Sequence, residues 1–176
     1  MNIMNAIAWL FPIIFMIHDF EEIVMINAWQ EKNKQYIKNM KDKYIPFNFK
    51  GSTASISFGV AIEFVIISVL TIISYLLNSY VVWFGLFVAF VLHLLFHVLM
   101  CINFKKYVPG VVTSIIFFPL CCFIVYSTNI SLHYNISTVL FSILIGTLIM
   151  MGIIYILHKS MKKFESWLGK YSTKFL

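Results

Sequence analysis

Residues 54–103 read ASISFGVAIEFVIISVLTIISYLLNSYVVWFGLFVAFVLHLLFHVLMCIN, two long apolar runs separated by a short polar turn at 78–80. Glu63 is the one Asp, Glu, Lys or Arg residue in this stretch. A lipid bilayer has a hydrocarbon core about 30 Å thick, which a helix of roughly 20 apolar residues can cross. The stretch therefore predicts two transmembrane helices, at 54–77 and 81–103, joined by a tight connection.

The rest of the chain has the same apolar character. Hydrophobic residues make up 61% of it, charged residues 11%, and the mean hydropathy is +0.89, whereas roughly a quarter of the residues in a soluble domain are charged. Further apolar runs lie at 3–26, 108–127 and 138–158. We therefore predict an all-α membrane protein, a five-transmembrane-helix bundle, with one transmembrane domain at 1–160 and a basic tail at 161–176.

The distribution of basic residues predicts how the bundle sits in the membrane. All 13 cationic residues are lysines, and they lie only at 32–50, 105–106 and 159–174, next to the ends of apolar runs. Lysine-rich loops are retained on the cytoplasmic side of a membrane. We expect the N-terminus outside, the C-terminus in the cytoplasm, and a location in the bacterial plasma membrane. Topology explains the net charge of +6, so nucleic acid is not an expected partner.

The tail has the spacing of an amphipathic helix. Phe164, Trp167, Leu168 and Tyr171 recur at helical intervals with lysines between them. Helices of this kind lie in the membrane–water interface with their apolar face toward the acyl chains. We therefore expect a C-terminal interfacial amphipathic helix.

A polar cluster interrupts the first apolar run. In the sequence HDFEE at 18–22, His18, Glu21 and Glu22 fall within an arc of about 100° on one helix, with Asp19 at its edge. An ionisable residue inside a transmembrane helix costs about 2.5–3.5 kcal/mol on insertion scales and usually faces a protein interior or cavity. The first helix is therefore expected to direct three ligands or acid/base groups toward its neighbours.

Two other predicted helices carry matching groups. His93 and His97 have i, i+4 spacing, which stacks both imidazoles on one helix face and is common among metal ligands, and Glu63 lies in the preceding helix. At 1.5 Å per residue from the expected cytoplasmic ends, the depths are about 6 Å for Glu22, 9 for His97, 12 for His18, 13 for Glu63 and 15 for His93. We expect these groups to share one layer in the inner half of the bilayer.

The predicted site has no Lys or Arg to balance its carboxylates, because none lies within the spans. Shared protons, imidazolium groups or a bound metal must neutralise them. Metal is the preferred prediction, either zinc or a dinuclear iron or manganese centre. The expected metal ligands are His18, Glu22, Glu63, His93 and His97. The expected catalytic residues are Glu21, Glu63 and Tyr107, a glutamate being the general base.

Two short motifs carry a family resemblance. HDFEE at 18–22 resembles the H-x-x-E-E signature of the HXXEE-motif family of integral membrane proteins, and YVPG at 107–110 resembles that family's Y-x-P-G motif. The family's intervening histidine would be His93 or His97. The resemblance covers about residues 10–115 and implies no assigned activity. Tyr107 would lie at the cytoplasmic mouth, either donating a hydrogen bond to a substrate or serving as an interfacial tyrosine.

These features together predict a membrane-embedded, metal-dependent enzyme of the hydrolase type. We expect it to act on a lipid or other apolar substrate through the His/Glu cluster in the cytoplasmic half of the bilayer. Three alternatives stay open: a metal-free His/Glu acid–base isomerase, a proton or metal carrier, and an accessory protein whose polar cluster only fixes helix packing. The expected partners are the bilayer and the apolar substrate, and the sequence indicates no particular protein partner.

Overall fold

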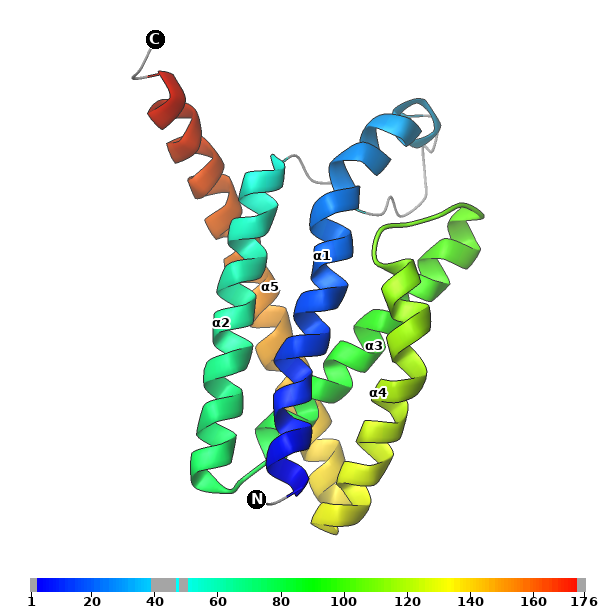
Figure 1. Ribbon diagram of the computed structural model, residues 1–176, viewed down its shortest axis with the longest axis vertical. Coiled ribbons are helices and arrows are strands. Elements are labelled where there is room, and N and C mark those ends of the chain that lie inside the picture. The colour runs from blue at the N-terminus through cyan, green and yellow to red at the C-terminus, as the bar shows by residue number, and fades with distance from the viewer. Residues whose placement is uncertain (1–2, 39–46, 48–50, 174–176) are drawn as a thin grey trace.

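The computed structural model describes residues 3–38, 47 and 51–173, and this part of the chain contains five α-helices and no strand (Figure 1). In chain order the helices are α1 (Ile3–Lys38), α2 (Thr53–Leu77), α3 (Val81–Phe104), α4 (Val111–Leu132) and α5 (Ile136–Thr173). In Figure 1, α1 lies in front between α2 and α4, and α3 and α5 cross behind it. The prediction of an all-helical chain is therefore confirmed for the described residues.

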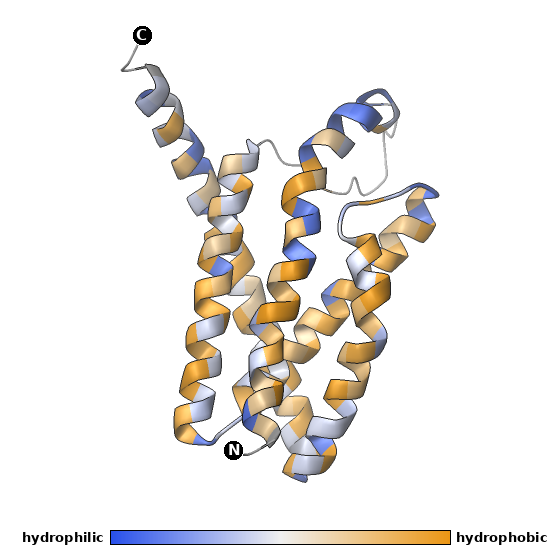
Figure 2. Cartoon of the chain, viewed as in Figure 1, coloured by the Kyte–Doolittle hydropathy of each residue, from blue (hydrophilic) through white to orange (hydrophobic). Residues whose placement is uncertain are grey.

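Four of the helices, α2 to α5, are long and apolar enough to cross a membrane, and they indicate an integral membrane protein. Figure 2 shows the apolar residues in orange along these helices. α1 is not one of the four, because the polar residues at 18–22 and the polar end beyond Ile26 interrupt its apolar sequence. A fifth span through α1 and the orientation of the termini stay predictions.

The first and last helices are longer than predicted, whereas α2 and α3 agree with the predicted spans to within one residue. α1 continues beyond residue 26 to Lys38, and Trp29 gives its polar end an apolar contact by packing on Phe104 of α3, with 5.1 Å between ring centroids. α5 runs unbroken to Thr173, so the tail continues this helix instead of forming a separate one. The position of the tail in the membrane interface stays a prediction.

The fourth helix begins later than predicted. It starts at Val111 and not at residue 108, because Gly110 has a φ of 83° and caps the helix from outside. This left-handed backbone conformation is open to glycine and strained for residues with a side chain. Pro109, the second residue of the predicted span at 108–127, therefore lies in the connection from α3.

Aromatic side chains pack α1 against α3 near the N-terminal end of α1. Phe11 meets the edge of Phe87 with 5.2 Å between ring centroids, and Trp83 stacks on Phe87 at 5.1 Å. All three side chains are buried. Aromatic pairs in these geometries stabilise by about 0.5–1.5 kcal/mol beyond their burial. This packing fixes how α1 is rotated relative to α3, and both helices carry polar residues further along.

α3 and α5 touch at the level of the backbone where they cross. A Cβ added to Gly85 would lie 1.9 Å from the carbonyl oxygen of Ser142, and one added to Gly146 would lie 2.1 Å from the carbonyl carbon of Gly85. Only glycine permits such a close approach of two helices. From this crossing the two helices diverge toward the end of the bundle where α1 ends (Figure 1).

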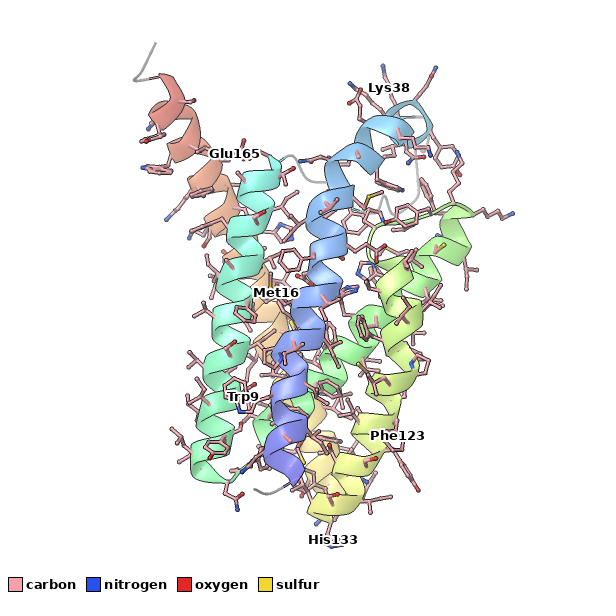
Figure 3. All side chains as sticks on the ribbon, in the orientation of Figure 1. Trp9, Met16, Lys38, Phe123, His133 and Glu165 are labelled. Carbon is pink, nitrogen blue, oxygen red and sulfur yellow. The ribbon has the colours of Figure 1, made fainter. Side chains whose placement is uncertain are left out.

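The far half of α5 is held against α2. The hydroxyl and the N–H of Ser52 donate hydrogen bonds to Glu165 Oε2 at 2.5 and 3.1 Å, and Glu165 lies beside the start of α2 in Figure 3. Nearby, the rings of Phe58 and Phe164 stack with 4.2 Å between their centroids. In this half of the bundle α5 therefore packs closely on α2 while it diverges from α3.

Candidate functional site

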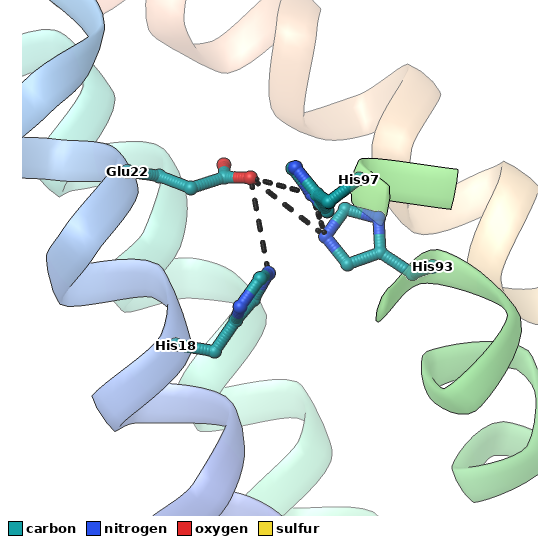
Figure 4. A group of neighbouring side chains, drawn as sticks. All are labelled: His18, Glu22, His93 and His97. Atoms are coloured by element: carbon teal, nitrogen blue, oxygen red, sulfur yellow. Dashed lines mark hydrogen bonds and ion pairs between the residues drawn. The ribbon is translucent and has the colours of Figure 1, made fainter. Parts of the chain in front are cut away.

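Four side chains from α1 and α3 meet inside the bundle. His18 and Glu22 of α1 and His93 and His97 of α3 each offer one ligand atom, and these atoms lie within 4.8 Å of one another (Figure 4). Glu22 Oε1 lies 2.8 Å from His97 Nε2, 3.8 Å from His93 Nε2 and 3.9 Å from His18 Nε2. The structure thus brings together four of the five predicted ligands, which we call the His/Glu cluster.

Helical periodicity builds this cluster from two facing pairs. Residues four apart on a helix lie on one face a turn apart, so each helix presents two groups to the other. His18 and His97 are fully buried, and Glu22 and His93 are partly buried. The ring of Phe90 lies between the aromatic core and the cluster, 5.8 Å from the His18 ring centroid. The cluster therefore lies in a largely water-excluded setting, where unbalanced charge is costly.

A backbone carbonyl fixes the proton of His97. The Nδ1 atom of this residue lies 2.9 Å from the carbonyl oxygen of Pro109. Since a carbonyl oxygen can only accept, Nδ1 carries the proton and donates it. The neutral ring then has its lone pair on Nε2, which faces the cluster. Metal-binding histidines are typically held in this way by an acceptor behind the ring.

Two hydrogen bonds in series fix the proton of His18. Thr113 Oγ1 lies 2.6 Å from Glu21 Oε2 and 2.9 Å from His18 Nδ1. The hydroxyl has a single proton, which it donates over the shorter contact to the carboxylate, so its oxygen accepts from His18 Nδ1. The lone pair of His18 is then on Nε2. This atom is buried and has no hydrogen-bond partner among the described residues.

Electron-rich atoms therefore converge at the centre of the cluster. Glu22 Oε1 has no hydrogen-bond partner in the described part of the chain, although it lies 2.8 Å from His97 Nε2, because that nitrogen carries the lone pair of its ring. His93 Nε2 lies 3.0 Å from the same nitrogen, at hydrogen-bond distance. Such atoms repel one another unless a proton or a cation lies among them. Zinc bonds of about 2.0–2.2 Å in a tetrahedron place ligand atoms about 3.4 Å apart. The three contacts of Glu22 Oε1, at 2.8–3.9 Å, bracket that spacing.

Glu21 is directed to the start of α4 and not to the cluster. Its Oε1 accepts from the Tyr107 hydroxyl at 2.8 Å and from the Val112 N–H at 3.3 Å, and its Oε2 accepts from the Thr113 N–H at 2.8 Å. Burial and the hydrogen bond to Glu21 raise the pKa of the Tyr107 phenol, so the hydroxyl keeps its proton and donates it. Glu21 and Tyr107, both expected as catalytic residues, therefore lie behind His18. Neither is among the described residues that line the cavity beside the His/Glu cluster.

The turn at 107–110 forms one wall of the cluster. A Cβ added to Gly110 would lie 2.8 Å from His97 Nδ1 and 3.0 Å from His18 Cε1, so the absence of a side chain makes room for both rings. The indole N–H of Trp29 donates to the carbonyl oxygen of Tyr107 at 2.6 Å and holds the turn against α1. The YVPG sequence is therefore an integral part of the site.

A cavity of about 860 Å³ adjoins the cluster and is lined by Glu22, His93 and His97 together with mostly apolar residues of α1, α2, α3 and α5. Its volume falls within the range of about 300–1,000 Å³ that is typical of ligand pockets. Glu63 lines this cavity but is not one of the four residues whose ligand atoms converge. Asp19 also lines it, and none of the described lining residues is Lys or Arg.

Sequence reasoning missed three contributors to the site. Thr113 and the carbonyl of Pro109 hold the two buried imidazoles. His158 lines the cavity, although the sequence places it at the end of a predicted span. The nearness of Thr113 to the YVPG sequence was the one available signal. A backbone carbonyl leaves no mark in a sequence, and the position of His158 depends on the path of α5.

The fold and the site together define a class: a helical membrane protein in which a buried cluster of three histidines and one glutamate lies beside an apolar cavity. The family described as "Protein of unknown function with HXXEE motif" matches residues 9–124, and the chain belongs to this family. The matched region includes all four residues of the His/Glu cluster and the turn at 107–110. No curated protein and no solved structure matches the chain.

Proposed function

We propose that this protein is a membrane-embedded, metal-dependent enzyme of the hydrolase type that acts on a lipid-like substrate. The observation that carries this proposal is the convergence of three imidazole Nε2 atoms on one carboxylate oxygen, with the Nδ1 protons of His18 and His97 held by acceptors behind the rings. Three histidines and a carboxylate form a donor set suited to zinc and to iron or manganese.

The residues divide into ligands, positioning groups and a base. Three of the residues His18, His93, His97 and Glu22 would hold a zinc ion and leave a fourth position for water, or all four would hold an iron or manganese ion with further positions open. The bound metal would supply an activated water and a Lewis acid. Glu63 faces the cavity beside them and is our candidate for the general base. Glu21, Thr113 and Pro109 would orient the ligands from behind.

We infer that the protein lies in the bacterial plasma membrane and that the end of the bundle where α1, α3 and α5 finish faces the cytoplasm. All lysines in the described ranges lie at the end of the bundle where α1, α3 and α5 finish, at 32–38, 105–106 and 159–170. This clustering supports the orientation in which lysine-rich ends are retained inside.

A second candidate function is metal-free acid–base catalysis, as in an isomerase. The 2.8 Å separation of His97 Nε2 and Glu22 Oε1 favours it, because one proton between these atoms would also relieve their repulsion. In that case His97 and Glu22 would exchange a proton with the substrate directly.

Metal analysis separates the two candidates. The full chain is purified in detergent without chelators and examined by inductively coupled plasma mass spectrometry, beside His93→Ala, Glu22→Gln and His158→Ala. We expect about one metal ion per wild-type chain, loss of the metal in the first two variants, and retention in the third, whose residue lines the cavity outside the cluster. A metal-free wild-type protein that remains folded by circular dichroism would refute the metalloenzyme and support the isomerase.

A further inference from the structure

α3 and α5 both flank the cavity on one side of the bundle, at a place that we call the opening. The two helices are in backbone contact at Gly85 and Gly146 and separate beyond this crossing (Figure 1). The cavity lies in the separated half, because its lining includes Leu92 and Phe96 of α3 and Met151 and Ile154 of α5. Both flanks of the opening are therefore walls of the cavity.

These flanking side chains are not covered by other residues of the bundle. The four residues of the two flanks line the cavity and are at the same time 42–63% exposed. The seam between α2 and α5 is different, because Met161 packs within 2.9 Å of the Cβ position of Gly59 and the Ser52–Glu165 hydrogen bonds close it. Since α3 and α5 are membrane-spanning candidates, the outer surface between them faces lipid.

The interior of the cavity suits a flexible apolar chain. Phe15 and Phe90 line it, and so do four methionines: Met100, Met150, Met151 and Met161. Methionine side chains are unbranched and adapt to ligands of varied shape. An acyl or alkyl chain therefore finds a continuous apolar surface between the opening and the His/Glu cluster.

The polar part of the cavity selects the charge of the head group. Asp19, Glu22 and Glu63 all line it, and the described lining contains no Lys or Arg. Phosphate and carboxylate groups are usually bound by Arg or Lys. An anionic head group would therefore find no Lys or Arg partner in the described lining, whereas the three carboxyl groups can hydrogen-bond a neutral or cationic head group whether they are ionised or share protons.

We propose that the opening between α3 and α5 is a lateral portal, through which an amphiphile with a neutral or cationic head group enters from the bilayer. Its head group reaches the His/Glu cluster, and its alkyl chain lies along the methionine-lined wall. The portal assigns a substrate class to the proposed enzyme. Only the reaction of the head group at the cluster, and not its entry, rests on the proposed function.

Photolabelling tests the head-group selectivity. The detergent-purified full chain is irradiated with three probes that carry a diazirine on the same hexadecyl chain: hexadecylamine, hexadecanol and hexadecyl phosphate. We expect the amine and the alcohol to label cavity residues such as Met100 and Met161, and the phosphate to label them at least about tenfold less. Equal labelling by the phosphate would overturn the head-group assignment.

Bulky substitutions test the portal. Leu92→Trp combined with Ile154→Trp narrows both flanks, while Leu99→Trp combined with Leu148→Trp adds the same bulk at exposed positions of α3 and α5 that do not line the cavity. We expect the first pair to abolish labelling of Met100 by the alcohol probe and the second pair to leave it at the wild-type level. Full labelling in the first pair, with unchanged thermal unfolding, would show that the substrate does not enter between α3 and α5.

Metal content measured on the same preparations keeps the two proposals apart. Selective labelling of the cavity in a protein without metal would retain the portal and remove the metalloenzyme. A stoichiometric metal in a protein whose cavity no probe labels would retain the metalloenzyme and remove the portal.

Discussion

At the level of single residues, the hydroxyl of Thr113 has two roles in one atom. It donates to Glu21 and accepts from His18, so a carboxylate acts on an imidazole that it does not touch. A negative group behind a ligand histidine increases the basicity of the nitrogen that faces the metal. Thr113 and Glu21 are therefore positioning residues of the proposed centre.

Replacing Thr113 with Val should weaken metal binding by about 10–100-fold, the usual effect of removing the group behind a ligand histidine. Val keeps the branched shape but cannot accept from His18 Nδ1. Zinc titration of the purified chain against a competing chelator measures the loss, and ¹⁵N NMR of the histidine rings reports whether the proton of His18 moves to Nε2.

Thr113→Ser is the matched control, because it retains the hydroxyl and should bind zinc much as the wild type does. The positioning role would be disproved by a Val variant with wild-type zinc affinity and unchanged ring nitrogen shifts.

The residue types of the site could be predicted, but their directions only in part. Neighbouring residues are 100° apart on a helix, so the HDFEE sequence could not tell whether Glu21 or Glu22 faces α3. The aromatic packing of Phe11 on Phe87 sets the rotation of α1, which turns Glu22 to α3 and Glu21 to α4. Glu63 lies at a suitable depth but lines the cavity outside the cluster.

At the level of elements, the turn at 107–110 connects the residues of three helices. The carbonyl of Pro109 accepts from His97 of α3, the hydroxyl of Tyr107 donates to Glu21 of α1, and Gly110 is the N-cap residue of α4. These four residues of the connection between α3 and α4 thus help to position both buried imidazoles. The positive φ of Gly110 and the two rings close to it explain in physical terms why a glycine stands at this position.

Gly110→Ala should both destabilise the bundle and remove the metal. The added methyl group meets the rings of His97 and His18 within 3.0 Å, and a positive φ costs a non-glycine residue about 1–3 kcal/mol. Thermal unfolding in detergent and metal content are the two measurements. Gly152→Ala serves as control, because a Cβ at that position meets nothing within 4 Å. Equal unfolding temperatures for the two variants would contradict this assignment.

The apolar helices were predictable from hydropathy, but the ends of α1 and α5 were not. A hydropathy pattern records where lipid contact ends, and a helix continues as long as its backbone hydrogen bonds and side-chain contacts favour it. Trp29 extends α1 by packing on Phe104, and Phe164 extends the contact of α5 with α2 through Phe58. Trp29 and Phe164 both lie outside the predicted spans.

At the level of the whole molecule, the number of membrane crossings depends on α1. Five crossings place the two termini on opposite sides of the membrane, and four place them on the same side. α1 carries His18 and Glu22 of the cluster, and α2 and α4 flank this helix in the bundle (Figure 1). Because its polar residues face protein, their burial is compatible with a crossing.

Reporter fusions test the predicted orientation in a bacterial host. Alkaline phosphatase fused after Ser79, in the connection between α2 and α3, should be active outside, and a green fluorescent protein at the C-terminus should fluoresce in the cytoplasm. An N-terminal epitope tag should be removed by protease added to spheroplasts. A protected tag, with both fusions behaving as expected, would show that α1 does not cross.

The hydrogen bond between His18 and Thr113 also has a consequence for the biosynthesis of the protein. The two residues are 95 positions apart in the chain, which at about 5–20 residues per second corresponds to about 5–20 seconds of translation. During this interval α1 has been made, while the turn and the helix start that hold its polar groups do not yet exist. The native site can therefore form only after the start of α4 has been synthesised.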